Sequence, residues 1–193
     1  MTKFILAGGY VSYAADGGRQ FCRDLTGGFK SPVKILVVFF ARSRDSWKAD
    51  LEQEKKFFAD NLHDRACRLI MASPEPMEFH QQVQNADVIW IKGGDTPPLM
   101  ETLTQDLDWT KHLHGKTVGG TSAGAYALAT IYHELDRPVL GQGLGFVPVK
   151  IAAHWQSPEY KPSATWDNIR QELEATDPEL PVLLLKEGEY RVY

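Results

Sequence analysis

Short apolar runs alternate along the chain with segments of helical character, and this alternation restricts the fold more than any other feature of the sequence. The apolar runs are brief, rich in Val, Ile and Leu, and often end in Gly or a polar residue, which is typical of buried parallel strands. Seven such strands are predicted: FILAGG (4–9), KILVVFF (34–40), CRLIMA (67–72), DVIWIKGG (87–94), TVGGT (117–121), VKIAAH (149–154) and PVLLLKEG (181–188).

Helical segments are predicted between these strands, over residues 17–26, 46–62, 75–85, 97–106, 123–130 and 163–176. Strands that alternate with helices need crossover connections, which keep the strands parallel and place helices on the faces of the sheet. The sequence therefore predicts an α/β fold, a three-layer sandwich with a mostly parallel central sheet, formed as one domain by residues 1–193. The tail EGEYRVY could form a hairpin with the last predicted strand.

Charge and hydropathy narrow the range of partners. The chain has 25 acidic and 21 basic residues, a formal net charge of -4, and no Lys/Arg cluster that would follow phosphates, so we expect no nucleic acid partner. The longest apolar stretches, such as 35–40, are too short to span a bilayer, and the start MTKFILAGGY lacks a signal-peptide cleavage pattern. We expect a cytoplasmic protein without a membrane partner. A homodimer is one oligomeric state that the sequence leaves open.

Cysteines and histidines form no pattern typical of a metal site. Cys22 and Cys67 are the only cysteines, and each lies in an apolar-patterned segment, so we expect two reduced, buried thiols. His112 and His114 are two positions apart, and no His-Glu-x-x-His motif occurs. We therefore expect neither a metal nor a cofactor.

The stretch VGGTSAGA (118–125) contains the pattern G-x-S-x-G around Ser122. In a nucleophile elbow, a serine occupies a sharp strand-to-helix turn that tolerates only small neighbours. Such a turn leaves the N–H of Ala123 at the start of a helix, directed at an oxyanion. A serine that merely caps an alanine-rich helix is equally compatible with the pentapeptide.

A second glycine-rich turn, KGGDT (92–96), follows a predicted strand. Its backbone N–H groups are free of side-chain obstruction, which favours Gly94 as a second oxyanion donor and Asp95 as a partner for a substrate amino group. An ordinary strand-to-helix turn, with Asp95 or Thr96 as the helix cap, is the alternative and is the commoner case for such a turn taken alone.

The candidate general base is His154, the one histidine that ends an apolar strand; His133, just beyond the nucleophile helix, is its competitor. Two carboxylates could orient the base. Glu187 lies at the end of the final strand and Asp136 lies in a polar loop. We favour Glu187, because a strand end is the more rigid platform.

These segments together resemble the peptidase E (aspartyl dipeptidase) group and its relatives the cyanophycinases, serine hydrolases with a class I glutamine amidotransferase-like, flavodoxin-like fold. VGGTSAGA resembles the family's nucleophile motif, KGGDT its Gly-Gly-Asn-Thr turn, and GLGFVP (143–148) its segment before the catalytic histidine. The resemblance implies that Ser122 is the nucleophile, His154 the base, and Ala123 and Gly94 the oxyanion donors. Asp136, with Pro138, matches the peptidase E pattern Asp-x-Pro, whereas Glu187 matches the cyanophycinase-like branch.

Two departures from the family pattern concern the substrate. Asp95 stands where the family has Asn, which could strengthen the grip on a free α-amino group or disfavour acidic substrates. The family's Thr-Arg, whose arginine is expected to bind the substrate aspartate, is replaced here by Thr165-Trp166. We therefore expect no strict aspartate specificity, and we place substrate contacts at Gly93, Asp95, Thr96 and Trp166.

The expected activity is hydrolysis of a small peptide, a dipeptide, after its free N-terminal residue by a Ser-His-Glu/Asp triad. A broader esterase or amidase that uses the same serine remains open. So does a catalytically silent amidotransferase-like domain that binds a ligand.

Overall fold

Six strands form the central sheet of the computed structural model, which describes residues 1–193. The strand order is β10-β1-β5-β4-β2-β3, and every neighbouring pair is parallel except β10 with β1. The prediction of a mostly parallel central sheet is therefore confirmed. The strands are β1 (Lys3–Ala7), β2 (Val33–Val38), β3 (Cys67–Met71), β4 (Val88–Ile91), β5 (Thr117–Thr121) and β10 (Tyr190–Val192).

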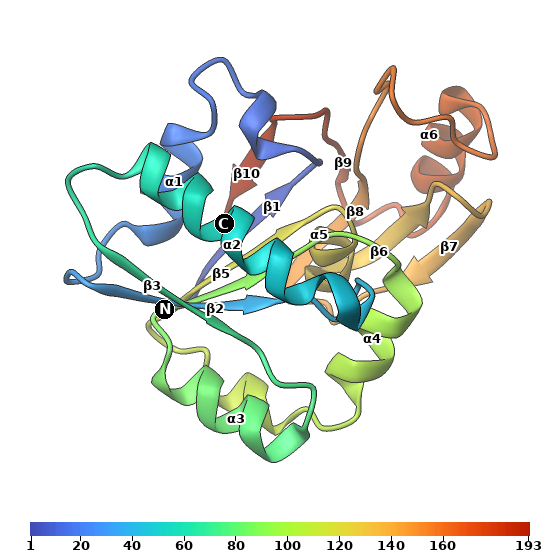
Figure 1. Cartoon of the computed structure of the whole chain (residues 1–193). Coiled ribbons are helices and arrows are strands. Elements are labelled where there is room, and N and C mark those ends of the chain that lie inside the picture. Colours follow the sequence, from blue (N-terminus) through green and yellow to red (C-terminus); the bar gives the residue numbers. More distant parts are fainter.

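Helices cover both faces of this sheet (Figure 1). Every residue of β4 and β5 is buried, as expected of central strands between two helical layers. All six predicted helical segments form helices: α1 (Arg19–Thr26), α2 (Trp47–Asn61), α3 (Pro76–Asn85), α4 (Thr96–Thr104), α5 (Ala123–Leu128) and α6 (Trp166–Ala175). Short 3-10 helices η1 (Val11–Tyr13), η2 (Arg44–Ser46) and η3 (Asp108–His112) lie in the connections.

A second sheet of four strands stands beside the central one, in the order β7-β6-β8-β9. The predicted strands at 149–154 and 181–188 belong to this sheet, not to the central sheet. The chain enters this sheet at β6, because the six residues of α5 span about 9 Å, too little for a crossover back to the central sheet; β8 then pairs with β6, and β9 with β8. The strands are β6 (Ala129–Glu134), β7 (Val139–Gln142), β8 (Val147–Ala152) and β9 (Val182–Leu184).

Two differences from the sequence analysis concern where elements end. The helix predicted over 123–130 ends at Leu128, and the chain continues directly into β6 at Ala129. The tail does not form a hairpin with β9, because β10 pairs antiparallel with β1 at the edge of the central sheet. Because β10 begins opposite the carboxyl end of β1, the segment that joins β9 to β10 passes that end of β1.

One large apolar core joins the two sheets. It contains 42 buried residues, among them Ile5 of β1, Trp90 of β4 and Ile151 of β8. A smaller core of five buried residues, including Ile169 and Leu173, packs α6 onto the second sheet. The large core thus fixes the carboxyl ends of β1, β5 and β8 relative to one another. None of the helices combines the length and the apolar character that crossing a membrane requires.

Candidate active site

Ser122 lies at the sharp turn between β5 and α5. Its backbone has φ 51° and ψ -118°, a conformation that side-chain-bearing residues rarely adopt and that costs about 1–3 kcal/mol. The Ser122 N–H donates to the carbonyl of Ala7 at 3.0 Å, and the Ser122 carbonyl accepts from the N–H of Tyr126 at 2.9 Å. The local geometry is that of a nucleophile elbow, and no side-chain hydrogen bond of a helix cap is formed.

The glycines of the motif are required by close packing around this turn. A Cβ at Gly124 would collide with the carbonyl oxygen of Ile91 on β4, and a Cβ at Gly120 would collide with the carbonyl of Gly124. Helix α5 therefore approaches the sheet more closely than a helix with larger residues could. This close approach holds Ser122 at the carboxyl edge of the central sheet, where the residue is partly exposed and lines a cavity.

His154, two residues beyond β8, lies against the serine. Its Nε2 is 2.9 Å from the Ser122 Oγ, and its ring is stacked on Tyr160 with centroids 4.1 Å apart. The His154 N–H donates to the carbonyl of Gly8 at 2.6 Å, which ties the end of β8 to the end of β1. The imidazole is thus fixed by its backbone hydrogen bond, by the stacked ring of Tyr160 and by the contact of Nε2 with Ser122. The residue is only 5% exposed.

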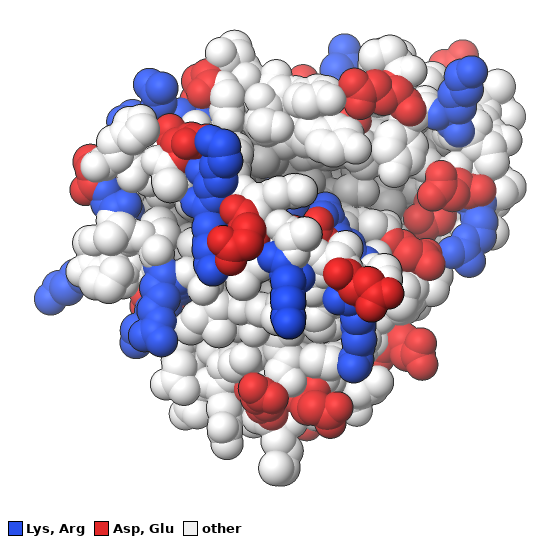
Figure 2. All heavy atoms as spheres, viewed as in Figure 1, with Lys and Arg blue, Asp and Glu red and all other residues white.

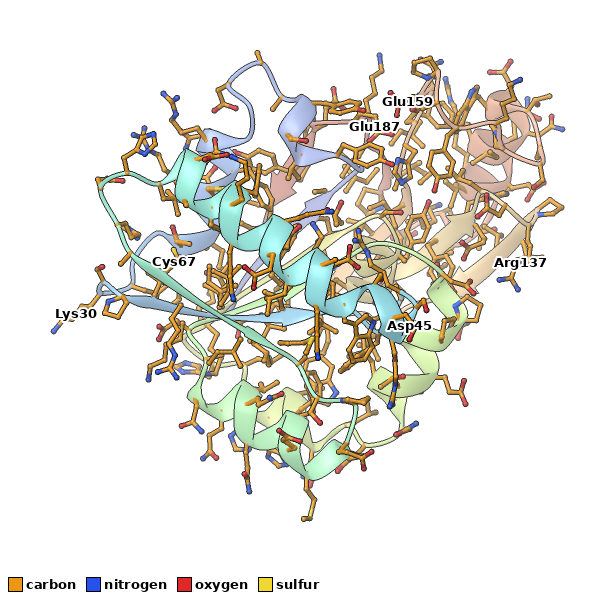
Figure 3. The ribbon with its side chains drawn as sticks, in the orientation of Figure 1. Lys30, Asp45, Cys67, Arg137, Glu159 and Glu187 are labelled. Carbon is orange, nitrogen blue, oxygen red and sulfur yellow. The ribbon has the colours of Figure 1, made fainter.

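Glu187, in the segment between β9 and β10, completes a chain of contacts. Its Oε1 is 2.6 Å from His154 Nδ1, and its Oε2 accepts the N–H of Tyr10 at 2.8 Å. Both carboxylate oxygens therefore have a partner. Figure 3 shows Glu187 on the same side of the molecule as Glu159, which accepts a hydrogen bond from the Tyr13 hydroxyl.

The two alternatives from the sequence lie elsewhere. Asp136 is exposed in the turn between β6 and β7 and makes no hydrogen bond with His154, whose Nδ1 contacts Glu187. His133 is buried and faces α6, where its Nε2 is 3.2 Å from Glu172, and its Nδ1 has no partner. The structure brings Ser122, His154 and Glu187 together and leaves Asp136 and His133 out of this group.

The two expected oxyanion donors lie on either side of the serine. The N–H groups of Gly94 and Ala123 make no hydrogen bond within the protein, so both remain available. Gly94 has a positive φ of 150°, and a Cβ there would collide with the carbonyl of Ala41. Only glycine fits this backbone, which brings the turn after β4 beside Ser122; a Cβ on neighbouring Gly93 would lie 2.8 Å from the Ser122 Cβ.

This close fit predicts the effect of Gly94→Ala. The added methyl group must displace the turn from the carbonyl of Ala41, and with it the expected donor, so we expect kcat for peptide hydrolysis to fall roughly 10²–10³-fold. Gly115→Ala is the matched control, because Gly115 also has a positive φ, of 78°, but no atom lies within 4 Å of its added Cβ. Equal kcat values for both variants would show that catalysis does not depend on the position of the Gly94 N–H.

The residues expected to contact substrate are only partly brought together. Gly93 and Gly94 line the cavity above Ser122. Asp95 is exposed beside them and pairs with Arg137 at 3.2 Å; Arg137 projects at the edge of the molecule in Figure 3. Thr96 is fully buried, and its hydroxyl donates to Glu134. Trp166 packs against Trp155 in the smaller core, away from the cavity lining.

A cavity of about 410 Å³ opens at Ser122. Figure 2 shows the surface hollowed above α2, between that helix and the part of the chain that holds η1 and α6. The segment after β1 lines one side and α2 the other, with Tyr160 at the histidine end. Its lining residues are Gly9, Tyr10, Val11, Ser12, Arg42, Gln53, Glu54, Phe57, Lys92, Gly93, Gly94, Thr121, Ser122, His154 and Tyr160.

Three carboxylates, called here the acidic rim, lie close together beside the cavity: Asp95 follows the lining residue Gly94 and pairs with Arg137, Glu134 accepts from the Thr96 hydroxyl, and Asp136 precedes Arg137. Burial raises the pKa of Glu134, and the nearby carboxylates Asp136 and Asp95 raise it further. Burial likewise raises the pKa of the Tyr160 hydroxyl, with Asp136 the next largest cause.

The cysteines take no part in this site. Both thiols are free, and burial raises the pKa of Cys22 and of Cys67, which keeps them protonated at neutral pH. No group of three or more His, Cys, Asp or Glu side chains lies close enough together to hold a metal ion.

Sequence reasoning missed several residues of the cavity, above all Arg42, Lys92, Tyr10 and Tyr160. Lys92 directly precedes the Gly93-Gly94 turn, so the sequence indicates that it lies near the site. The sequence does not indicate whether its side chain points into the cavity. Tyr160 lies in an irregular segment without periodicity, and nothing in the sequence places it on the face of His154.

Comparison with known proteins gives a family and a fold. The model of peptidase family S51 matches residues 8–191. No curated protein matches the chain in sequence. A peptidase from an acI-B1 actinobacterium superposes with a TM-score of 0.68 at 20% identity, over 100% of this chain and 83% of the other. A putative peptidase E protein from Listeria monocytogenes EGD-e gives 0.67 at 15% identity, over 100% and 97%. Likeness at these identities concerns the fold, and it agrees with the predicted architecture.

Proposed function

The chain belongs to peptidase family S51, and from this membership, together with the contacts of Ser122, His154 and Glu187, we propose that it hydrolyses dipeptides after a free N-terminal residue. It is a serine peptidase of the peptidase E type. The observation that carries the proposal is the continuous path from the Ser122 Oγ through both nitrogens of His154 to Glu187, with distances of 2.9 and 2.6 Å. Ser122 and His154, the first two members of this path, line a cavity of about 410 Å³, large enough for a small peptide.

The first half of the reaction forms an acyl-enzyme. The Ser122 Oγ attacks the peptide carbonyl carbon while its proton passes to His154 Nε2. The carbonyl oxygen becomes an oxyanion that accepts hydrogen bonds from the N–H groups of Gly94 and Ala123. When the tetrahedral intermediate collapses, the C–N bond breaks, and His154 gives its proton to the leaving amine.

The second half returns the enzyme to its starting state. Water attacks the ester carbonyl and gives a proton to His154 Nε2, and the same two N–H groups bind the second oxyanion. The ester C–O bond then breaks, the N-terminal residue leaves as a free amino acid, and the proton returns to the Ser122 Oγ. Glu187 accepts from the Nδ1–H throughout, which keeps Nε2 unprotonated before each attack and stabilises the imidazolium that forms.

The free N-terminus of the substrate is recognised by carboxylate at the acidic rim. Asp95 directly follows the oxyanion donor Gly94, and Asp136 is next in the chain to the Arg137 with which Asp95 pairs. A substrate ammonium there would share Asp95 with Arg137, which is exposed and free to turn outward. Because no arginine of the chain matches the aspartate-binding position of the family motif, strict aspartate specificity is not part of the proposal.

A dipeptide panel that varies the first residue tests this function. We expect turnover of several dipeptides with free amino groups, including leucine and aromatic N-termini beside aspartate, and a loss of at least about tenfold in kcat/KM on N-acetylation, because one charge-assisted contact is removed. Release of the free amino acids is measured by chromatography. Efficient turnover of p-nitrophenyl esters, with no cleavage of any dipeptide or aminoacyl-p-nitroanilide, would contradict the proposal and favour a broader esterase.

A further inference from the structure

Two cations line the wall of the cavity that α2 and the end of β4 form. Lys92 follows β4 and is 9% exposed, and Arg42 follows β2 and is half-buried. Both side chains belong to the lining of the cavity that contains Ser122. Neither has a part in the hydrolysis steps above, so their presence beside the reactive serine calls for a separate explanation.

The carboxylates that pair with these cations already have a partner on each oxygen. Glu54 binds Lys92 Nζ with Oε1 at 2.6 Å, and its Oε2 accepts the Trp90 Nε1–H at 2.9 Å. Asp50 binds Arg42 Nη1 with Oδ1 at 2.9 Å, and its Oδ2 accepts the hydroxyl of Ser46 at 2.8 Å. Each oxygen of the two carboxylates is therefore taken by a donor within the protein.

The cations themselves keep unused donors. An ammonium group has three N–H bonds and a guanidinium has five. Lys92 Nζ has Glu54 as its one hydrogen-bond partner and lies 5.0 Å from the centre of the Trp90 ring. Arg42 uses its Nε–H for the carbonyl of Gly93 at 3.0 Å and its Nη1 for Asp50. The Nη2 group of Arg42 and the remaining N–H bonds of Lys92 have no acceptor in the protein. This wall of the cavity thus offers several charged donors and no free carboxylate oxygen.

The turn beside this wall carries the exposed carboxylate Asp95, whose backbone N–H donates to the carbonyl of Ala41 at 2.8 Å and whose side chain pairs with Arg137. The acidic rim carries Asp95, Glu134 and Asp136 against the one cation Arg137. A dipeptide has an ammonium at one end and a carboxylate at the other, roughly 7 Å apart when extended. The C-terminal carboxylate is the one anionic group that every dipeptide has, and Lys92 and Arg42 line the same cavity as Ser122, which attacks the carbonyl one residue before it.

We propose that Lys92 and Arg42 form a subsite for the C-terminal carboxylate of the substrate. The inference rests on the proposed dipeptidase function and adds to it the residues that recognise the C-terminus of the substrate. A carboxylate bound one residue beyond the scissile bond leaves no room for a longer chain, so the subsite selects dipeptides over longer peptides. Glu54 and Asp50 hold the two cations in place, and the contact of Arg42 with the Gly93 carbonyl joins the subsite to the turn that carries Gly94.

The test compares a dipeptide with its C-terminal amide, using the N-terminal residue that the panel shows to be preferred. We expect the wild-type enzyme to prefer the free acid by roughly 10- to 100-fold in kcat/KM, as expected for one or two charge-assisted hydrogen bonds. Arg42→Gln and the double variant Lys92→Gln with Glu54→Gln, which removes a buried pair without leaving a lone charge, should bring this ratio close to one. Lys48→Gln, an exposed change on α2, should leave the ratio unchanged.

Each other outcome counts against a defined claim. Equal turnover of acid and amide by the wild type would overturn the subsite and leave the peptidase function standing. Lack of turnover of every dipeptide would overturn both. A second pair of dipeptide amides, with Glu or Gln as the second residue, separates a C-terminal carboxylate from a side-chain carboxylate. A preference that follows the Glu side chain and not the C-terminus would overturn the assignment. The amide also serves as the folding control, because a misfolded variant loses both substrates together.

Discussion

Ser122→Ala is expected to lower kcat for dipeptide hydrolysis roughly 10⁴- to 10⁶-fold while the protein stays folded. The Ser122 hydroxyl is the one nucleophile within reach of His154 Nε2, at 2.9 Å, so its removal ends covalent catalysis. Alanine has the same Cβ as serine, so the positive φ of 51° strains both residues to a similar degree. The turn itself should therefore not change. The residual rate would come from substrate binding and the oxyanion donors alone.

Ser12→Ala is the matched control for this variant. Ser12 is an exposed serine that lines the same cavity but makes no contact with His154. We expect its kcat to stay within about twofold of the wild type, since surface substitutions have small effects. Labelling by a fluorophosphonate probe should disappear in Ser122→Ala and persist in Ser12→Ala. Dipeptide cleavage by Ser122→Ala at the wild-type rate would refute the covalent mechanism.

Much of this site was predictable because several of its residues lie at the ends of strands. Ser122 follows a predicted strand, and His154 and Gly94 are the last residues of two others; the carboxyl ends of parallel strands gather at one edge of a sheet. The apolar runs fixed which residues would come to that edge. The sequence could not show that β8 and Glu187 reach it from a second sheet, because the split depends on α5 being only six residues long.

The other parts of the site depend on contacts between segments without periodicity. Tyr10 donates its backbone N–H to Glu187, and any residue but proline could do so. Lys92 was visible as a charged residue at a strand end, but its direction is set by Glu54, 38 positions earlier on α2. Trp166 was expected at the substrate because of its place in a motif, yet the side chain packs on Trp155, since an indole at the start of α6 is drawn into the smaller core.

Glu187→Gln is expected to lower kcat about 10⁴-fold, the size of effect known for the corresponding change in a Ser-His-Asp triad. The carboxylate accepts hydrogen bonds on both sides, from the His154 ring at Nδ1 and from the Tyr10 N–H. A glutamine has only one oxygen. If that oxygen keeps the Tyr10 N–H, its NH₂ group faces Nδ1 and favours the tautomer in which Nε2 carries the proton.

In that tautomer His154 cannot take the proton of Ser122, so the loss should appear in kcat more than in KM. Asp136→Asn is the matched change at the exposed carboxylate of the β6–β7 turn, and it should cost no more than a few-fold. A loss in Asp136→Asn with near wild-type activity in Glu187→Gln would reverse the assignment. Such a result would require the β6–β7 turn to move onto His154 when substrate binds, because Glu187 now occupies Nδ1 at 2.6 Å.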